Sequence, residues 1–380
     1  MANEVDYGMF SDIAQLDCIS IVGDDRDLWF LENGRLLQWL FARRFMVLGT
    51  GGSSLGGRCI AEFSRQKENV TFVNNLDPRT MAKTLDEISD DVNFLCISKS
   101  GETLETISQL LLIIDSLKKS GETAAGLADR VVVITDTETS SLRTIALEYN
   151  FFCVNHPRRI GGRFSIFSAV GMLPALICGI DPMKIRKSAK NYLDNHFKAA
   201  VDGAFFIREN HPLHVFFIYS DQLSYFGQWL AQLYAESTGK NNLGITPLLA
   251  SGSVDQHSQL QLYLAGPRDK SFTFFLEKQQ TDLNIPSTFI PPQFEYLKHK
   301  NLQDIFAAQY KATWESLLKT QLPIRRIEFD AVTPEILGEL FMHFMLEAIM
   351  VCSLLQVNAF DQPAVERGKK ITRELLGRTS

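Results

Sequence analysis

The fold is decided by the stretch VNFLCISKSGET, residues 92–103. Its first six residues form a near-continuous apolar run, which is typical of a strand buried on both faces of a sheet. An amphipathic pattern begins at Leu104 and predicts a helix. The hydroxyl and backbone N–H groups of residues 98–103 therefore gather at a helix N-terminus, where the positive end of the helix dipole binds anions. We expect this loop to hold the phosphate group of a small metabolite.

Similar apolar runs lie before and after this strand, and most of them are followed by turn residues and a helical pattern. They predict further strands at residues 45–48, 70–73, 131–134 and 151–154. Buried strands that alternate with helices form a parallel sheet with helices on both faces. A predicted helix over 165–178 completes this unit. The first half of the chain is therefore expected to be a doubly wound α/β domain.

The same alternation restarts after Asp181-Pro182, which predicts a second domain of the same kind. Strands are expected at residues 215–219, 247–250, 272–276 and 324–329. Helices are expected at residues 28–41, 223–237, 255–264, 302–320, 334–355 and 364–375, with a proline-containing loop over 282–292. We divide the chain into an N-terminal segment (1–34), two doubly wound domains (35–182 and 183–355) and a C-terminal helical arm (356–380).

From the composition and the cysteine pattern we expect a globular enzyme in the cytoplasm. Of the 380 residues, 22% are charged and 45% are apolar, which argues against disorder, and the net charge of −6 gives no reason to expect nucleic-acid or membrane-surface binding. The six cysteines show no CxxC or Cys–His spacing, as expected of reduced thiols without a metal. The apolar stretch 336–355 contains Glu339, His343 and Glu347, so we expect a buried or interface helix rather than a membrane span.

A glycine-rich turn follows the first predicted strand, over residues 49–57. A dinucleotide fingerprint would need glycine at position 54, where this chain has serine. A P-loop would need lysine after Gly57, where this chain has Arg58. What remains is a turn that lets a ligand approach the backbone, with Ser53 offering a hydroxyl. A plain structural turn is the alternative, as simple helix capping by Ser100 or Thr103 is for the 98–103 loop. The two loops together, at neighbouring strand ends, favour ligand binding.

These two loops resemble those of the sugar isomerase (SIS) fold, an α/β domain that binds phosphosugars. Further segments are similar to motifs of the phosphoglucose isomerase family. They are GGRFSIFSAVG (161–171), QLYAESTGK (232–240), the Gln256-His257 pair, and Gln362 followed seven residues later by Lys369. All of them occur in the order that the family shows, from residue 49 to residue 370.

The resemblance implies reversible isomerisation of glucose 6-phosphate to fructose 6-phosphate, a step of glycolysis and gluconeogenesis, without metal or cofactor. It assigns the base that forms the enediol(ate) to Glu236 and charge stabilisation to Arg163. It assigns ring opening to His257 and Lys369, with His257 donated by the other subunit of a homodimer. It also implies a set of substrate-binding residues: Gly52, Ser53, Ser98, Lys99, Ser100, Thr103, Gln232 and Gln362.

The chemistry of the residues agrees with these roles but leaves plainer interpretations open. A positioned carboxylate and a histidine that titrates near neutrality suit proton transfer, and an arginine suits a developing anion. Taken one by one, Glu236 could be a surface carboxylate, Arg163 part of a salt bridge at a domain edge, His257 a structural histidine and Lys369 a solvated charge.

The chain also departs from the family pattern. Ser100-Gly101-Glu102 is the wider SIS form of the phosphate loop, and no aromatic residue follows His257 early in its helix. Two alternative functions therefore stay open from the sequence. One is an isomerase of dual glucose and mannose specificity, and the other is a SIS-type sensor that binds a sugar phosphate without turnover.

Overall fold

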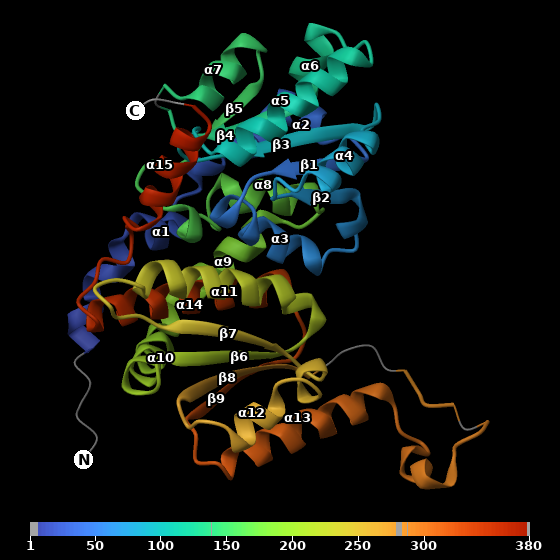
Figure 1. Cartoon of the computed structure of the whole chain (residues 1–380), viewed down its shortest axis with the longest axis vertical. Helices are drawn as coiled ribbons and strands as arrows, with labels where there is room; N and C mark the ends of the chain where they lie inside the picture. The colour runs from blue at the N-terminus through green and yellow to red at the C-terminus, as the bar shows by residue number, and fades with distance from the viewer. Residues whose placement is uncertain (1–6, 138, 279–282, 287, 378–380) are drawn as a thin grey trace.

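Two parallel sheets, one in each half of the chain, form the frame of the computed structural model (Figure 1). The structure describes residues 7–137, 139–278, 283–286 and 288–377. The fold class predicted from the sequence is confirmed, because all strand pairs in both sheets are parallel and helices cover both faces. The exact domain limits stay a prediction.

The first sheet has the strand order β2-β1-β3-β4-β5. Its strands are β1 (Arg44–Leu48), β2 (Val70–Val73), β3 (Val92–Ile97), β4 (Val131–Thr135) and β5 (Phe152–Asn155). One face packs on α4 (Pro78–Asp86), α5 (Leu104–Lys119), α6 (Ala124–Arg130) and α7 (Ser141–Glu148). The other face packs on α2 (Gly34–Trp39), α3 (Leu55–Glu62) and α8 (Ala169–Ile177).

The second sheet has the order β7-β6-β8-β9. Its strands are β6 (Leu213–Tyr219), β7 (Thr246–Ser251), β8 (Lys270–Glu277) and β9 (Ile324–Phe329). Helices α9 (Pro182–Asn195), α10 (Phe197–Glu209), α11 (Ser224–Thr238) and α14 (Pro334–Leu354) lie on the side that faces the first unit (Figure 1). Helices α12 (Leu260–Ala265) and α13 (Leu302–Leu318) cover the opposite face.

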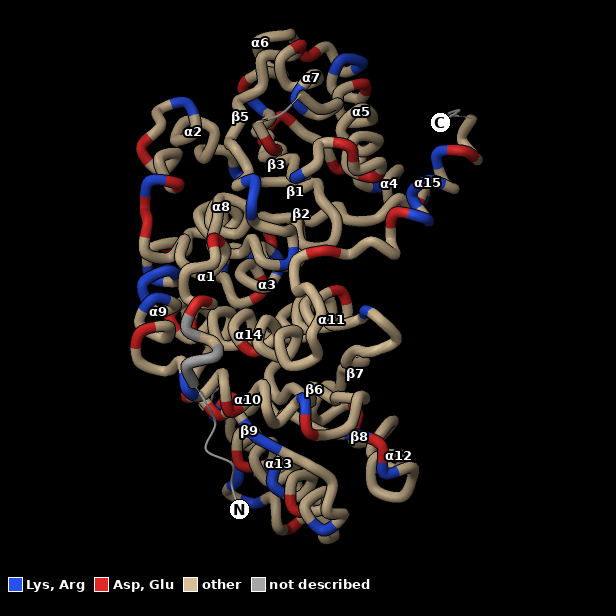
Figure 2. The backbone as a smooth tube through the Cα atoms, turned by 90° about the vertical axis from the view of Figure 1, so that its left-hand side faces the viewer, with Lys and Arg blue, Asp and Glu red and all other residues tan. Residues whose placement is uncertain are grey.

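The remaining elements are short or peripheral. The N-terminal residues form η1 (Tyr7–Gln15), α1 (Asp17–Ser20), η2 (Ile21–Gly23) and η3 (Asp25–Glu32). Short 3₁₀ helices are η4 (Gly51–Ser53), η5 (Lys67–Asn69), η6 (Gly162–Phe164), η7 (Asp221–Leu223), η8 (Val254–Gln256) and η9 (Pro292–Leu297). The last helix, α15 (Val365–Leu375), buries none of its residues and stands away from the body in Figure 2.

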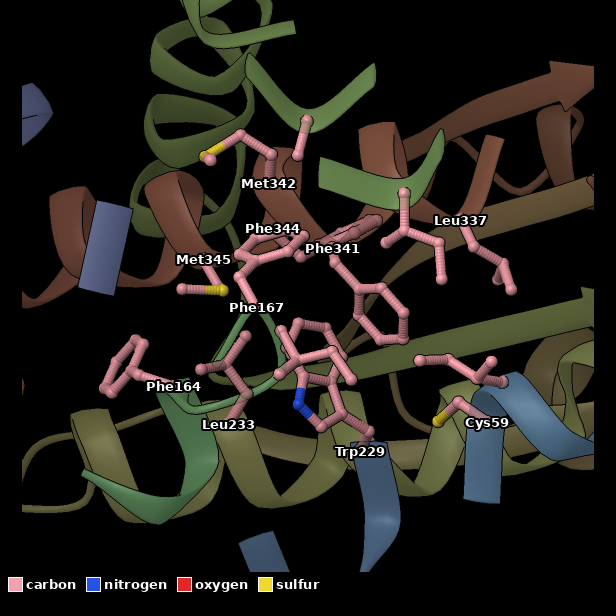
Figure 3. Packing of buried hydrophobic residues seen from close by; sticks show 14 of the residues in the cluster. Cys59, Phe164, Phe167, Trp229, Leu233, Leu337, Phe341, Met342, Phe344 and Met345 are labelled. Atoms are coloured by element: carbon pink, nitrogen blue, oxygen red, sulfur yellow. The ribbon is translucent and has the colours of Figure 1, made fainter. Parts of the chain in front are cut away.

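One continuous apolar core joins the two units. Aromatic side chains from the segment before α8, from α11 and from α14 meet there, among them Phe167, Trp229, Phe341 and Phe344 (Figure 3). Trp229 and Phe341 contact edge to face with ring centroids 4.9 Å apart. Because this core lies between the sheets, α11 is held against both units.

Helix α14 confirms the expectation for the apolar stretch near the C-terminus. Within the described ranges it is the one helix long and apolar enough to cross a bilayer, and 78% of its most apolar window is buried inside the protein. Its sequence is apolar because it packs against α9, α10 and α11.

Three predicted helices begin or break elsewhere than expected. The helix predicted over 165–178 starts at Ala169, because the Ser168 hydroxyl accepts a hydrogen bond from the Val170 N–H and caps it there. The helix predicted over 28–41 is interrupted by Asn33, which caps α2. The helix predicted over 255–264 is divided into η8 and α12. Part of the loop predicted over 282–292 lies outside the described residues.

Candidate active site

The two predicted ligand loops lie side by side at the carboxyl ends of β1 and β3. These strands are neighbours, with Leu48 paired to Cys96, so the turns that follow them meet at the same sheet edge. An added Cβ on Gly49 would lie 3.1 Å from the Ile97 carbonyl oxygen, so the backbones are in close contact. Ligands of open α/β sheets bind at this edge.

The 98–103 loop holds its hydroxyl groups in a compact cluster. Ser98 is buried, and its Oγ lies 2.8 Å from Thr103 Oγ1 and accepts a hydrogen bond from the Gly101 N–H. Gly101 has a φ of +63°, and a Cβ there would collide with Ser140, which explains the glycine. Thr103 is the N-cap residue of α5 but makes no side-chain capping bond. Capping therefore does not account for these two hydroxyls.

Glu102, one of the departures from the family pattern, has a structural explanation. Its carboxylate accepts hydrogen bonds from the Ser141 N–H (2.7 Å) and the Ser141 hydroxyl (2.8 Å) at the start of α7. The Ser100 hydroxyl in turn accepts a bond from the Glu102 N–H. Glu102 thus ties the 98–103 loop to the start of α7.

Lys99 lies beside two groups that the sequence reasoning missed. Burial lowers the pKa of Lys99, and the carboxylate of Asp136 opposes this shift. His156 is 2% exposed, and burial together with the Lys99 charge lowers its pKa to about 4, so the imidazole is neutral at pH 7. Asp136 and His156 follow β4 and β5, and their distance from Lys99 in the chain left no local signal.

The Gly51-Gly52 turn is packed against the turn that carries Arg163. A Cβ on Gly52 would lie 2.2 Å from the carbonyl carbon of Gly162, a distance that no side chain could tolerate. Gly51 has a φ of +57°, and a Cβ there would lie 2.9 Å from Gln232 Nε2. The glycines are required so that β1, η6 and α11 can converge.

Arg163 lies at the point of convergence and is 2% exposed. Its N–H groups donate to Ser237 Oγ (2.8 Å), Glu236 Oε2 (3.1 Å), Gln362 Oε1 (2.8 Å) and the carbonyl oxygens of Ala359 and Asp361. Burial lowers the pKa of this guanidinium, and the Glu236 carboxylate opposes the shift. Arg163 therefore brings a buried positive charge to Glu236 and connects α11 to the C-terminal segment.

Glu236 is fixed at both carboxylate oxygens. Oε2 accepts from Arg163, and Oε1 accepts from Gln232 Nε2 at 2.9 Å, one helical turn earlier on α11. The Gln232 side-chain oxygen is buried and has no hydrogen-bond partner in the described part of the chain. Glu236 keeps a partly exposed side chain, so the carboxylate is oriented by the protein and still reachable from outside.

A cavity of about 810 Å³ opens beside Glu236. Its walls are the end of α11, the turn at 239–243 and the segment 356–365, which includes Gln362. This volume is in the range of small-molecule sites.

The structure of the single chain does not bring His257 and Lys369 to Glu236. His257 is exposed at the end of η8, and none of the described residues is hydrogen-bonded to its imidazole. Lys369 is exposed on α15 and pairs with Glu366 at 2.7 Å. The neighbouring Gln256 points inward, with its Nε2 2.7 Å from Tyr219 Oη and from Thr313 Oγ1.

Two further residues of the QLYAESTGK segment belong to the site but were not predicted as such. Ser237 accepts from Arg163, and Lys240 Nζ donates to the Glu236 and Ser237 carbonyl oxygens at the C-terminal end of α11. Both residues are part of the motif, so the motif itself could have identified them. Among the described residues, no group of three or more His, Cys, Asp or Glu side chains could hold a metal ion.

Comparison with known proteins gives a consistent result. The family model described as phosphoglucose isomerase matches residues 41–321. The glucose-6-phosphate isomerase of Carboxydothermus hydrogenoformans is 35% identical over 369 residues, covering 88% of this chain and 79% of the relative. A glucose-6-phosphate isomerase of Thermus thermophilus is 32% identical over 349 residues, covering 87% and 83%.

Solved structures agree on the fold. A hypothetical protein from Thermus thermophilus superposes with a TM-score of 0.88 at 29% identity, covering 96% of this chain and 91% of that one. A glucose-6-phosphate isomerase from Chlamydia trachomatis superposes with a TM-score of 0.76 at 19% identity, covering 99% and 76%.

Proposed function

Because the chain belongs to the phosphoglucose isomerase family, we propose that it interconverts glucose 6-phosphate and fructose 6-phosphate in the cytoplasm by acid–base chemistry at Glu236. The observation that carries the proposal is the junction of Gln232, Glu236, Arg163 and Gln362, which come from three distant segments. An oriented carboxylate beside a buried guanidinium is suited to moving a proton between adjacent carbons.

The phosphate group of the substrate binds at the 98–103 loop. The Ser98 and Thr103 hydroxyls, the N-terminus of α5 and the Lys99 ammonium supply the donors, with Ser100 at the loop edge. Gly52 and Ser53 lie on the adjacent turn, where the missing Cβ of Gly52 lets the Arg163 turn approach, and Gln232 and Gln362 line the sugar. The loop grips the end of the substrate that does not react.

In the forward reaction, the Glu236 carboxylate removes the proton from C2 of the open-chain aldose. The electrons of that C–H bond form the C1–C2 double bond of the enediol(ate), and the C1 carbonyl oxygen takes up the negative charge. Transfer of the C2 hydroxyl proton to the C1 oxygen makes that oxygen a hydroxyl and leaves the charge on the C2 oxygen, whose electrons form the new carbonyl in the next step. The same carboxyl group returns a proton to C1, which leaves the carbonyl at C2. Because the Arg163 N–H groups are all engaged within the protein, its positive charge stabilises the developing anion without a new hydrogen bond.

Ring opening needs a second acid–base pair at the far side of the sugar. We assign it to Lys369 and to His257 of the partner subunit, which makes the protein an obligate homodimer. The exposure of His257 supports donation to another chain, because an imidazole at the surface is free to enter a neighbouring site. Lys369 lies on α15, seven residues after Gln362, on the arm that leaves the cavity wall.

The proposal is tested by a coupled assay of the purified protein with fructose 6-phosphate, run beside mannose 6-phosphate and with a chelator present. We expect turnover of fructose 6-phosphate alone, unchanged by the chelator. Comparable turnover of mannose 6-phosphate would replace the proposal by dual specificity. Binding of fructose 6-phosphate without turnover would replace it by a sensor.

A further inference from the structure

Glu347 is a buried carboxylate on α14, and it contacts α11 on the side of that helix away from the proposed base, Glu236. Glu347 is 0% exposed, and both of its oxygens are engaged. Arg325 of β9 donates to them in a bidentate pair (2.6 and 2.7 Å), and the Tyr234 hydroxyl of α11 donates to Oε1. The Nε2 atom of His343 lies 3.1 Å from Oε2. Glu347 therefore connects α14, β9 and α11 through one group.

This cluster is charged inside the core. Burial alone would raise the pKa of Glu347, and the Arg325 guanidinium with His343 reverses the effect, so the pKa lies below its usual range. Burial and the Glu347 charge raise the pKa of Tyr234, which keeps its hydroxyl protonated as a donor. Gly203 makes room for the pair, since a Cβ there would collide with Glu347.

Tyr234 and Glu236 are two residues apart on α11, so they project from nearly opposite sides of the helix. A rotation of α11 about its axis would therefore displace both side chains at the same time. A second contact from α14 lies further along, where Cys352 Sγ donates to the Ser237 carbonyl oxygen at 3.2 Å. Helix α14 thus holds α11 at Tyr234 and at Ser237, on both sides of Glu236 in the sequence.

We propose that Glu347 is a positioning residue for the isomerisation, which sets the rotation of α11 through Tyr234 and so aims the Glu236 carboxylate at the substrate. This rests on the proposed role of Glu236. The bond from Tyr234 is the component of the cluster that reaches α11, whereas Tyr192 of α9, whose hydroxyl lies 2.6 Å from His343 Nδ1, does not contact that helix through its hydroxyl.

The test is Tyr234→Phe against the matched control Tyr192→Phe, each of which removes one buried hydroxyl from the same cluster. We expect Tyr234→Phe to lower kcat about tenfold while KM for fructose 6-phosphate changes less than about twofold, because a displaced base reduces turnover more than binding. Tyr192→Phe should keep kcat within about twofold of the original value. Equal kcat values for the two variants would overturn the inference.

A second arm separates positioning from general damage. In a Glu236→Gln background, Tyr234→Phe should cause no further loss of kcat, because the group that it positions is gone. A further tenfold loss there would contradict action through Glu236. If Glu236→Gln itself retained near-normal turnover, the proposed function would fail instead, so the two failures are distinguishable.

Discussion

Arg163 is the residue that assembles the site, because its side chain bonds to α11 and to the segment before α15 at once. A lysine could not reproduce this, since one ammonium has three donors and no planar fork. Gly52 matters as much, since it admits the Arg163 turn to a space that any side chain at position 52 would fill.

At the phosphate loop, the double variant Ser98→Ala with Thr103→Ala should raise KM for fructose 6-phosphate at least about tenfold and leave kcat nearly unchanged. Both the ground state and the transition state carry the phosphate, so its contacts contribute uniform binding. The measurement is steady-state kinetics beside Ser120→Ala, a hydroxyl at the opposite end of α5. A loss confined to kcat would contradict the assigned role.

The strands were predicted well because most of them contain a short apolar run, and β2, β3 and β9 match their predicted limits. Of these three, β3 is buried along its whole length, whereas β9 (IRRIEF) is mostly half-buried. Helix starts were predicted less well where a capping side chain such as Ser168 or Asn33 decides the boundary. The candidate site was predicted from motifs, and Gln232, Glu236 and Arg163, which the motifs contain, are hydrogen-bonded to one another in the structure. Asp136 and His156 were missed, because only the strand order brings them beside Lys99.

The contact between the turns of η4 and η6 predicts different effects for two glycine-to-alanine substitutions, one of which serves as the control. Gly52→Ala should lower kcat/KM about a hundredfold, because its Cβ must displace the Arg163 turn, and misplacement of about 1 Å is that costly. Gly161→Ala, at a position with nothing within 4 Å of the added Cβ and an ordinary φ of −70°, should keep most of the activity. Similar losses in both variants would show that the close approach is not the cause.

For the whole molecule, two buried histidines predict acid sensitivity. Burial lowers the pKa of His214 to about 3 and that of His156 to about 4, against 6.5 when exposed. At a pH between the lowered pKa of the folded protein and 6.5, the unfolded chain binds more protons than the folded protein does. The free energy of unfolding therefore falls as the pH drops below 6.5, by up to about 2 kcal/mol per histidine at pH 5.

Denaturant unfolding at pH 7 and pH 5 measures this effect. In His214→Asn the difference between the two pH values should shrink by about half, whatever the stability at pH 7. An undiminished difference would exclude His214 as a source. Glu347 does not contribute in this window, because its lowered pKa places its loss of stability below the ordinary carboxylate range.

The central claim is a site that uses Glu236 of one subunit and His257 of the partner subunit. Its most direct test is to mix two inactive variants, Glu236→Gln and His257→Ala, under conditions that allow subunit exchange, and to assay fructose 6-phosphate turnover. Each variant alone should lose about 10²–10⁴-fold in kcat. The mixture should regain about a quarter of the original activity, because half of the randomly formed dimers then hold one complete site. A mixture in which exchange is demonstrated but activity stays at the level of the parents, or a parent that is active alone, would contradict the account.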